Sequence, residues 1–219
     1  MFFRSRKTQK PLPDSVEECL ALFRTAADPR DRRKYVERAL EIDGDDLKAN
    51  RALLMLGRLG EGDRIDADLS RIKSYLLTIF VKPENFTPQQ RRAMAREIFE
   101  HPQLERCLDL CPDRDKFLRA YIRDLSGEYA QLFIDSAGEF SGSLLGFSTP
   151  SSRVNARVAP FMKALTNILD CPDLAREERL LLLEAMRDNA KVILGSDGMA
   201  RLYKELPPRV LSVLEAEET

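Results

Sequence analysis

The stretch from Phe117 to Phe133, FLRAYIRDLSGEYAQLF, decides the fold class. Its apolar side chains recur at intervals of three and four residues, the spacing that gathers side chains on one face of an α-helix. The stripe lasts for about five helical turns, so we predict an amphipathic helix that buries this face against its neighbours. The stripe consists of Phe117, Leu118, Tyr121, Ile122, Leu125, Tyr129, Leu132 and Phe133.

The same spacing recurs on both sides of this stretch, between short turns that contain proline, aspartate or glycine. Ser15 and Glu18 have the spacing of a capping box, and Thr87-Pro88-Gln89-Gln90 adds proline at the first helical position. No segment shows the period-two alternation and hairpin turns of a sheet. The sequence therefore predicts an all-α protein of stacked helical hairpins, roughly nine to eleven helices in a repeat-like array or two packed sub-bundles.

One helix should lie centrally in the second half of the chain. Leu180 to Leu183 place leucines around its whole circumference, which is typical of a helix sandwiched between neighbours. The turn-forming string Gly195-Ser196-Asp197-Gly198 should end this helix, and a short helix through Leu202 and Tyr203 should follow it.

Composition along the chain indicates four regions. Residues 1–13 form a basic arm, with four cations and no carboxylate in the first ten residues. Residues 14–136 form a helical-hairpin region, residues 137–152 a Gly/Ser-rich connector, and residues 153–219 a C-terminal helical sub-bundle. We expect the connector to be the internal boundary of the molecule.

Residues 33–60 resemble part of a tetratricopeptide repeat, a helix-turn-helix unit with a period of about 34 residues. The string from Ala39 to Asp43, ALEID, is similar to the end of the repeat's second helix, where a small residue lets neighbouring helices approach. The chain departs from the repeat at Gly44, where a turn proline is usual, and at Asn50 and Gly57, where bulky aromatics are usual. The resemblance implies stacked helical hairpins.

Charge and cysteine usage bound the possible partners. The formal net charge is -1, so no overall field attracts polyanions, and nucleic acid is not an expected partner. The four cysteines lack the close spacing of a secreted disulfide scaffold, and no apolar run is long enough to span a membrane. We expect a cytoplasmic protein, and note that the basic arm with Phe2 and Phe3 offers a second possibility, contact with an anionic membrane surface.

Motifs for chemistry are few. One group of residues could bind a metal or supply a nucleophile and a base: His101, Cys107 and Cys111. We favour a structural interpretation, in which the two thiols are buried and the histidine caps a helix. The sequence contains no phosphate-binding glycine loop and no paired-histidine zinc helix. We therefore predict no catalytic residue, no metal ligand and no cofactor.

Two basic clusters could face phosphates, one from Arg30 to Lys34 and one formed by Arg91, Arg92 and Arg96. Neighbouring glutamates, including Glu37 and Glu97, favour a solvated face of intrahelical ion pairs instead.

The function that we predict is a non-catalytic helical scaffold that binds a protein or peptide in a groove between hairpins. The candidate contact residues are aromatic: Tyr35, Tyr121 and Tyr129 if they are exposed, and Phe140 and Phe147 in a segment that is either a packed linker or a lid. A helical hydrolase or lyase with carboxylates in a central cavity is a first alternative, and a helical regulator of nucleic acid is a second. A pocket holding two or more inward carboxylates with raised pKa values would favour the enzyme.

Overall fold

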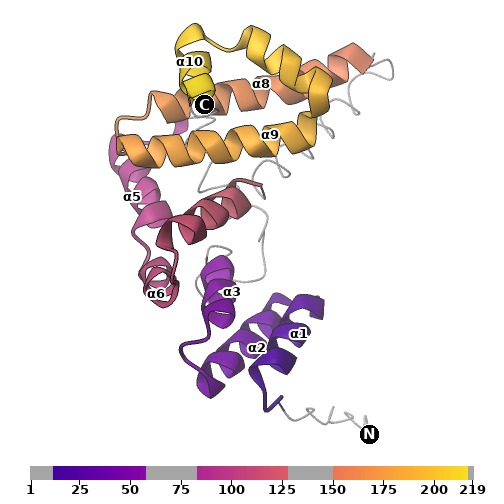
Figure 1. The fold of residues 1–219 in the computed structure, drawn as a ribbon, viewed down its shortest axis with the longest axis vertical. Helices are drawn as coiled ribbons and strands as arrows, with labels where there is room; N and C mark the ends of the chain where they lie inside the picture. Colours follow the sequence, from indigo (N-terminus) through magenta and orange to yellow (C-terminus); the bar gives the residue numbers. More distant parts are fainter. Residues whose placement is uncertain (1–11, 58–82, 128–149, 217–219) are drawn as a thin grey trace, which may run out of the picture. The chain divides into compact units, whose positions relative to one another are not determined.

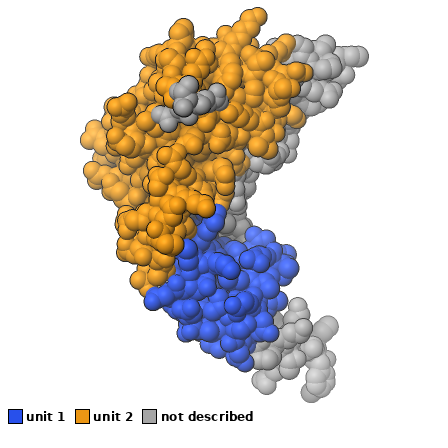
Figure 2. Space-filling model, in the orientation of Figure 1, with its two compact units in different colours: residues 1–65 blue, residues 66–219 orange. Residues whose placement is uncertain are grey.

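The computed structural model describes residues 12–57, 83–127 and 150–216 (Figure 1). These residues form helices joined by short turns and contain no strand, so the all-α prediction is confirmed for the described part of the chain. The chain divides into two compact units, residues 1–65 and residues 66–219 (Figure 2).

The first unit contains α1 (Val16–Thr25), α2 (Pro29–Ile42) and α3 (Leu47–Gly57). The second unit begins, within the described residues, with a short 3₁₀ helix, η1 (Pro83–Asn85), followed by α5 (Pro88–Phe99), α6 (Pro102–Leu110) and a helix over residues 114–127. It continues with α8 (Pro150–Leu169), α9 (Arg176–Glu205) and α10 (Pro208–Ala216).

Side-chain caps start α1 and α5 where the sequence indicated. The Ser15 hydroxyl accepts a hydrogen bond from the Glu18 amide at 3.2 Å. At α5 the predicted capping box is complete: Thr87 Oγ1 accepts from the Gln90 amide, and Gln90 Oε1 accepts from the Thr87 amide at 2.9 Å. Such caps satisfy amides that have no partner inside the helix, so each start is fixed locally.

The first unit packs α2 against both α1 and α3. Its core includes Cys19, Leu20, Ala39 and Ala49, and the small side chains among these allow the helix axes to approach closely. Asn50 is buried, and its side-chain amide donates to the backbone carbonyls of Gly44 and Asp46 at 3.0 and 2.9 Å. The core of this unit therefore contains a polar side chain whose amide is satisfied by backbone carbonyls.

In the second unit α8 and α9 pack along their lengths, and α10 contacts both (Figure 1). Leu182 and Leu183 of α9 are fully buried, as expected of a central helix, whereas Leu180 and Leu181 stay partly exposed. The buried Arg187 of α9 donates from Nη1 to the carbonyl of Leu214 in α10 at 3.2 Å.

The predicted break at residues 195–198 is confirmed, because two helical stretches of α9 meet at a sharp bend at Gly195. Gly195 has φ 64° and ψ -173°, and helical geometry resumes beyond it as far as Glu205. This combination lies outside both helical wells and is accessible almost only to glycine. The bend sends the last part of α9 back over the unit toward α10 (Figure 1).

The division between the units differs from the expected boundary. It falls at residues 65 and 66, and residues 83–127 lie in the same unit as residues 150–216. Most of the Gly/Ser-rich connector and residues 1–11 of the basic arm lie outside the described residues, while residues 150–152 are the first turn of α8. Among the described helices, none has both the length and the apolar character needed to cross a membrane.

Candidate partner-binding groove

The predicted aromatic contact residues are not gathered in one place. Tyr35 lies partly buried on α2, and Tyr129, Phe140 and Phe147 lie outside the described residues. Tyr121 fails the condition of exposure: it is 1% exposed, and its hydroxyl donates to the carbonyl of Ile98 at 3.2 Å. Because its polar tip finds a partner inside the unit, Tyr121 is a core residue that joins the 114–127 helix to α5.

A groove of about 350 Å³ lies between the helix over residues 114–127 and α9, both in the second unit. Ala120, Leu181 and the buried Ala185 give it apolar surface. Charged side chains from both helices line the rest, and we call the whole the charged groove. These side chains are Asp113, Asp115, Lys116, Arg119, Arg123, Glu184 and Asp188.

Helix periodicity places these residues on facing surfaces. Lys116, Ala120 and Arg123 are spaced by four and three residues, as are Leu181, Ala185 and Asp188, so each set lies on one face of its helix. Phe117, Tyr121, Ile122 and Leu125 occupy the opposite, buried face of the 114–127 helix. The polar face of the 114–127 helix therefore forms one wall of the charged groove.

Asp113 fixes where the 114–127 helix begins. Its Oδ1 accepts from the Lys116 amide at 3.0 Å, and its carbonyl accepts from the Phe117 amide at 3.1 Å. Aspartate at this position satisfies a free amide and complements the positive end of the helix dipole. Asp113 is thus a capping residue at one end of the groove.

Polar contacts hold the two walls together. Arg119 pairs with Asp115 on its own helix at 2.9 Å and with Glu184 across the groove. Asn189 of α9 donates from Nδ2 to the carbonyl of Arg123 at 3.1 Å. A Cβ on Gly127 would stand 3.0 Å from Asn189 Oδ1, so glycine allows this close approach.

The remaining charges differ in how they are engaged. Asp188 lies 3.5 Å from Nε of Arg187. Lys116 and Arg123, in contrast, are exposed, and their side chains form no ion pair within the described part of the chain. Among the residues that the structure describes, the charged groove thus presents two exposed cations that form no ion pair.

Val192 extends the apolar surface of α9 beyond the groove. It is 85% exposed, far more than any other large apolar side chain in the described ranges. Eleven residues separate it from Leu181, about three helical turns, so both lie within about 20° of the same face. Asp188 lies between Ala185 and Val192 on this face, so Val192 is an exposed apolar side chain beyond the residues that line the groove.

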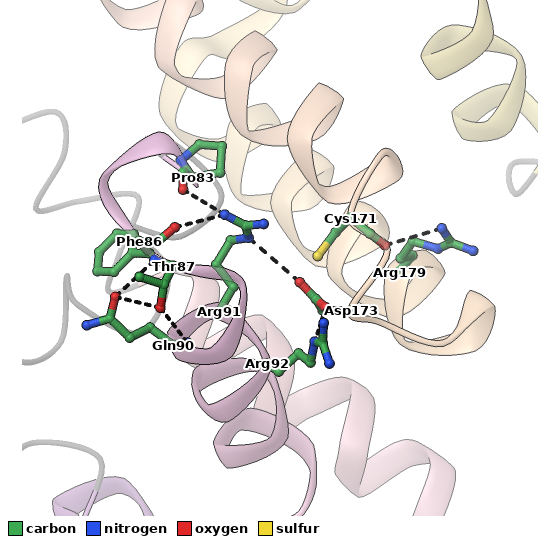
Figure 3. Close-up of polar contacts among 9 residues, drawn as sticks. All are labelled: Pro83, Phe86, Thr87, Gln90, Arg91, Arg92, Cys171, Asp173 and Arg179. Carbon is green, nitrogen blue, oxygen red and sulfur yellow. Dashed lines mark hydrogen bonds and ion pairs between the residues drawn. The ribbon is translucent and has the colours of Figure 1, made fainter.

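The arginines of α5 have a structural role that the sequence did not indicate. Arg91 donates from Nη1 to the carbonyls of Pro83 and Phe86 at 3.1 and 2.9 Å (Figure 3). Asp173, in the turn between α8 and α9, pairs with Arg92 at 3.0 Å and lies 3.7 Å from Arg91 (Figure 3). These two arginines therefore tie α5 to that turn instead of facing phosphate or forming intrahelical pairs. In the other cluster, the predicted pair of Arg33 and Glu37 is confirmed at 2.9 Å.

The histidine and cysteine cluster also has structural roles. His101 caps α6, since its Nδ1 accepts from the Gln103 amide at 3.1 Å. Cys107 is buried as expected, while Cys111 is only partly buried and its thiol donates to the carbonyl of Asp113 at 3.3 Å. Within the described residues, no three His, Cys, Asp or Glu side chains gather as metal ligands would.

Burial affects two other thiols. It raises the pKa of Cys171, which lies beside Asp173 in the turn between α8 and α9, and it raises the pKa of Cys19 in the first unit. A buried thiol that keeps its proton is a poor nucleophile. Both residues therefore act as small core side chains.

Comparison with protein-family models, with curated proteins and with solved structures finds no match to this chain.

Proposed function

We propose that this protein is a non-catalytic helical scaffold that binds a segment of a partner protein or peptide, and that the charged groove is its contact surface. The supporting observation is the groove itself, whose facing helices present apolar side chains flanked by charges. A surface of this kind suits an amphipathic helix, which lays its apolar face into a groove while charged flanks set its direction.

The contacts of the groove's carboxylates support binding over catalysis. Asp113 caps a helix, while Asp115 and Glu184 both pair with Arg119. Asp115 keeps 72% of its side chain exposed. A general acid or base is usually set apart by burial or by a second carboxylate, whereas Asp115 and Glu184 each pair with a cation and Asp113 accepts from a backbone amide.

The first unit supports the wider picture of a helical scaffold. The hairpin of α2 and α3 covers most of the residues that resemble a tetratricopeptide repeat, and small residues Ala39 and Ala49 lie in its core. We propose that this hairpin is a repeat-like element despite the replacement of an aromatic by Asn50. The four cysteines form no disulfide, which supports our proposal of a cytoplasmic location.

Site-specific photo-crosslinking tests the proposed function. A photoreactive amino acid replaces Val192 or Lys116 in the full-length protein, and a control replaces the exposed Arg157 of α8, which is not among the groove residues. After irradiation in extract of the source cell, we expect the same polypeptide adduct from both groove positions and none from the control. Adducts that are equal at all three positions, or absent from both groove positions, would contradict the proposal.

A further inference from the structure

The charges that line the groove differ in whether they already have a partner inside the protein. Arg119 engages the carboxylates of Asp115 and Glu184, Asp188 lies beside Arg187, and Asp113 holds the start of the 114–127 helix. Each groove carboxylate is thus in contact with a donor of the protein itself.

Two cations on the 114–127 helix differ from these carboxylates. Lys116 and Arg123 are exposed and form no ion pair within residues 12–57, 83–127 and 150–216. They lie seven residues apart on one helix, which places them about 10 Å apart along its axis and on the same face. The lysine ammonium carries three N–H donors and the arginine guanidinium five, so this wall offers two separated sites for carboxylates.

We propose that the charged groove binds an acidic amphipathic helix of a partner protein, with carboxylates two turns apart that reach Lys116 and Arg123. This proposal rests on the function proposed above and specifies the chemistry of the partner. Small apolar side chains of the bound helix contact Ala120 and Leu181, and Val192 lies exposed about one turn beyond the groove on the same side of α9. Complementary charge sets the direction and register of docking, while apolar contact contributes affinity for any amphipathic helix that fits the groove.

A displayed library of peptides tests both the groove as a binding site and its preference for an acidic helix. The peptides share a helical frame with a small apolar stripe, and the flanking positions are randomised over acidic, neutral and basic residues. Selection uses the full-length protein, and clones that also bind the Ala120→Trp variant are discarded. Ala120 is partly exposed and lines the groove, so tryptophan at this position should fill it. We expect enriched clones to carry acidic residues seven positions apart.

Charge-reversed variants then identify the contacts. For a selected acidic peptide, we expect Lys116→Glu with Arg123→Glu to weaken binding about tenfold or more, as two partly exposed ion pairs become repulsive contacts. A peptide with lysines in place of its acidic residues should recover binding to this variant. The matched control, Arg157→Glu with Arg176→Glu, makes the same charge change at exposed positions outside the groove and should bind as the wild type does.

The possible failures are distinguishable. Enriched clones without acidic bias that still require an open groove would overturn the acidic helix while leaving the scaffold function in place. No enrichment over Ala120→Trp would overturn both. Sedimentation of the unliganded protein provides one more outcome: a dimer that the Lys116→Glu and Arg123→Glu variant disrupts would assign the groove to a second copy of this chain and overturn the proposal. Circular dichroism of each variant confirms that its helices are retained.

Discussion

At the scale of single residues, the fold depends on a few positions whose side chain or backbone has no close substitute. Gly195 is one, because its backbone geometry produces the bend in α9. Asn50 is another, since its buried amide is satisfied by two backbone carbonyls. The role of Asn50 depends on the turn formed by Gly44 and Asp46, so it emerges only when the hairpin is folded.

Gly195→Ala should destabilise the second unit by about 1–3 kcal/mol, the usual cost of holding a residue with a Cβ in this sparsely populated region. No atom lies within 4 Å of the position that the new Cβ would take, so the cost comes from the backbone alone. Gly195→Asn should not restore stability, because asparagine tolerates the left-handed helical region and ψ -173° lies outside it. Urea unfolding measures both variants, and full recovery with asparagine would show that the bend has a different geometry.

Cys171 should make the free energy of unfolding depend on pH in the alkaline range. Burial raises the pKa of its thiol above the ordinary 9.0, so on raising the pH the unfolded chain loses this proton before the folded chain does. The free energy of unfolding should therefore be unaffected by this group below about pH 9 and fall as the pH rises toward the raised pKa. Urea midpoints at pH 8 and pH 10 should differ less for Cys171→Ala than for the wild type. An identical pH dependence in the two proteins would rule out this contribution.

At the scale of elements, helix starts could be predicted because their signals are local. The Thr87 and Gln90 box and the His101-Pro102 start each involve residues within one turn, and the structure has both. The break in α9 at Gly195 and the short helix that follows it could also be predicted, because the turn-forming glycines lie at the break itself. Leu180 to Leu183 were expected to be wholly enclosed, but Leu181 borders the charged groove.

The groove could not be located from the sequence. Its walls come from segments about 65 residues apart, as the pairing of Arg119 with Glu184 shows. Spacing within the 114–127 helix indicates a polar face but does not indicate which helix lies beside it. The burial of Tyr121 could not be predicted either, because it depends on packing against α5, where the carbonyl of Ile98 accepts from the tyrosine hydroxyl. Tyr121 therefore does not meet the condition of exposure under which it was a candidate contact residue.

The tie between α5 and the turn after α8 should depend on Asp173. This side chain is 8% exposed and lies between two arginines, so Asp173→Asn removes a charge on which Arg91 and Arg92 depend. We expect a loss of about 1–3 kcal/mol in the free energy of unfolding. Asp170→Asn is the matched control, because Asp170 lies three residues earlier and pairs with Arg209 in an exposed position, where loss of an ion pair costs about 0–1 kcal/mol. Equal losses in the two variants would contradict the structural role of Asp173.

At the scale of the whole molecule, the chain consists of two units with separate cores, residues 1–65 and residues 66–219. Composition favoured a boundary at residues 137–152 because glycine and serine are concentrated there. Where a chain divides depends on which helices share buried surface, and α5, α8 and α9 are tied together by long-range contacts such as that of Arg92 with Asp173. Such contacts leave no mark in local composition.

Separate cores predict separable unfolding. Leu54 is fully buried in α3 and Leu182 is fully buried in α9, so truncation of either to alanine should cost about 2–5 kcal/mol within its own unit. In scanning calorimetry of the full chain, Leu54→Ala should lower one transition and leave the other in place, and Leu182→Ala should do the reverse. If each variant shifts all of the heat absorption together, the chain unfolds as a single cooperative body.

Methyl nuclear magnetic resonance can show whether a partner segment binds in the charged groove. Isoleucine, leucine and valine methyl groups of the full-length protein report on Leu181 and Val192 at the groove, and on the similarly apolar Leu22 and Ile42, which are partly exposed in the first unit. On addition of a peptide selected from the library, the account predicts shifts at Leu181 and Val192 with Leu22 and Ile42 unchanged. Shifts at Leu22 or Ile42 without any at Leu181 and Val192 would contradict it.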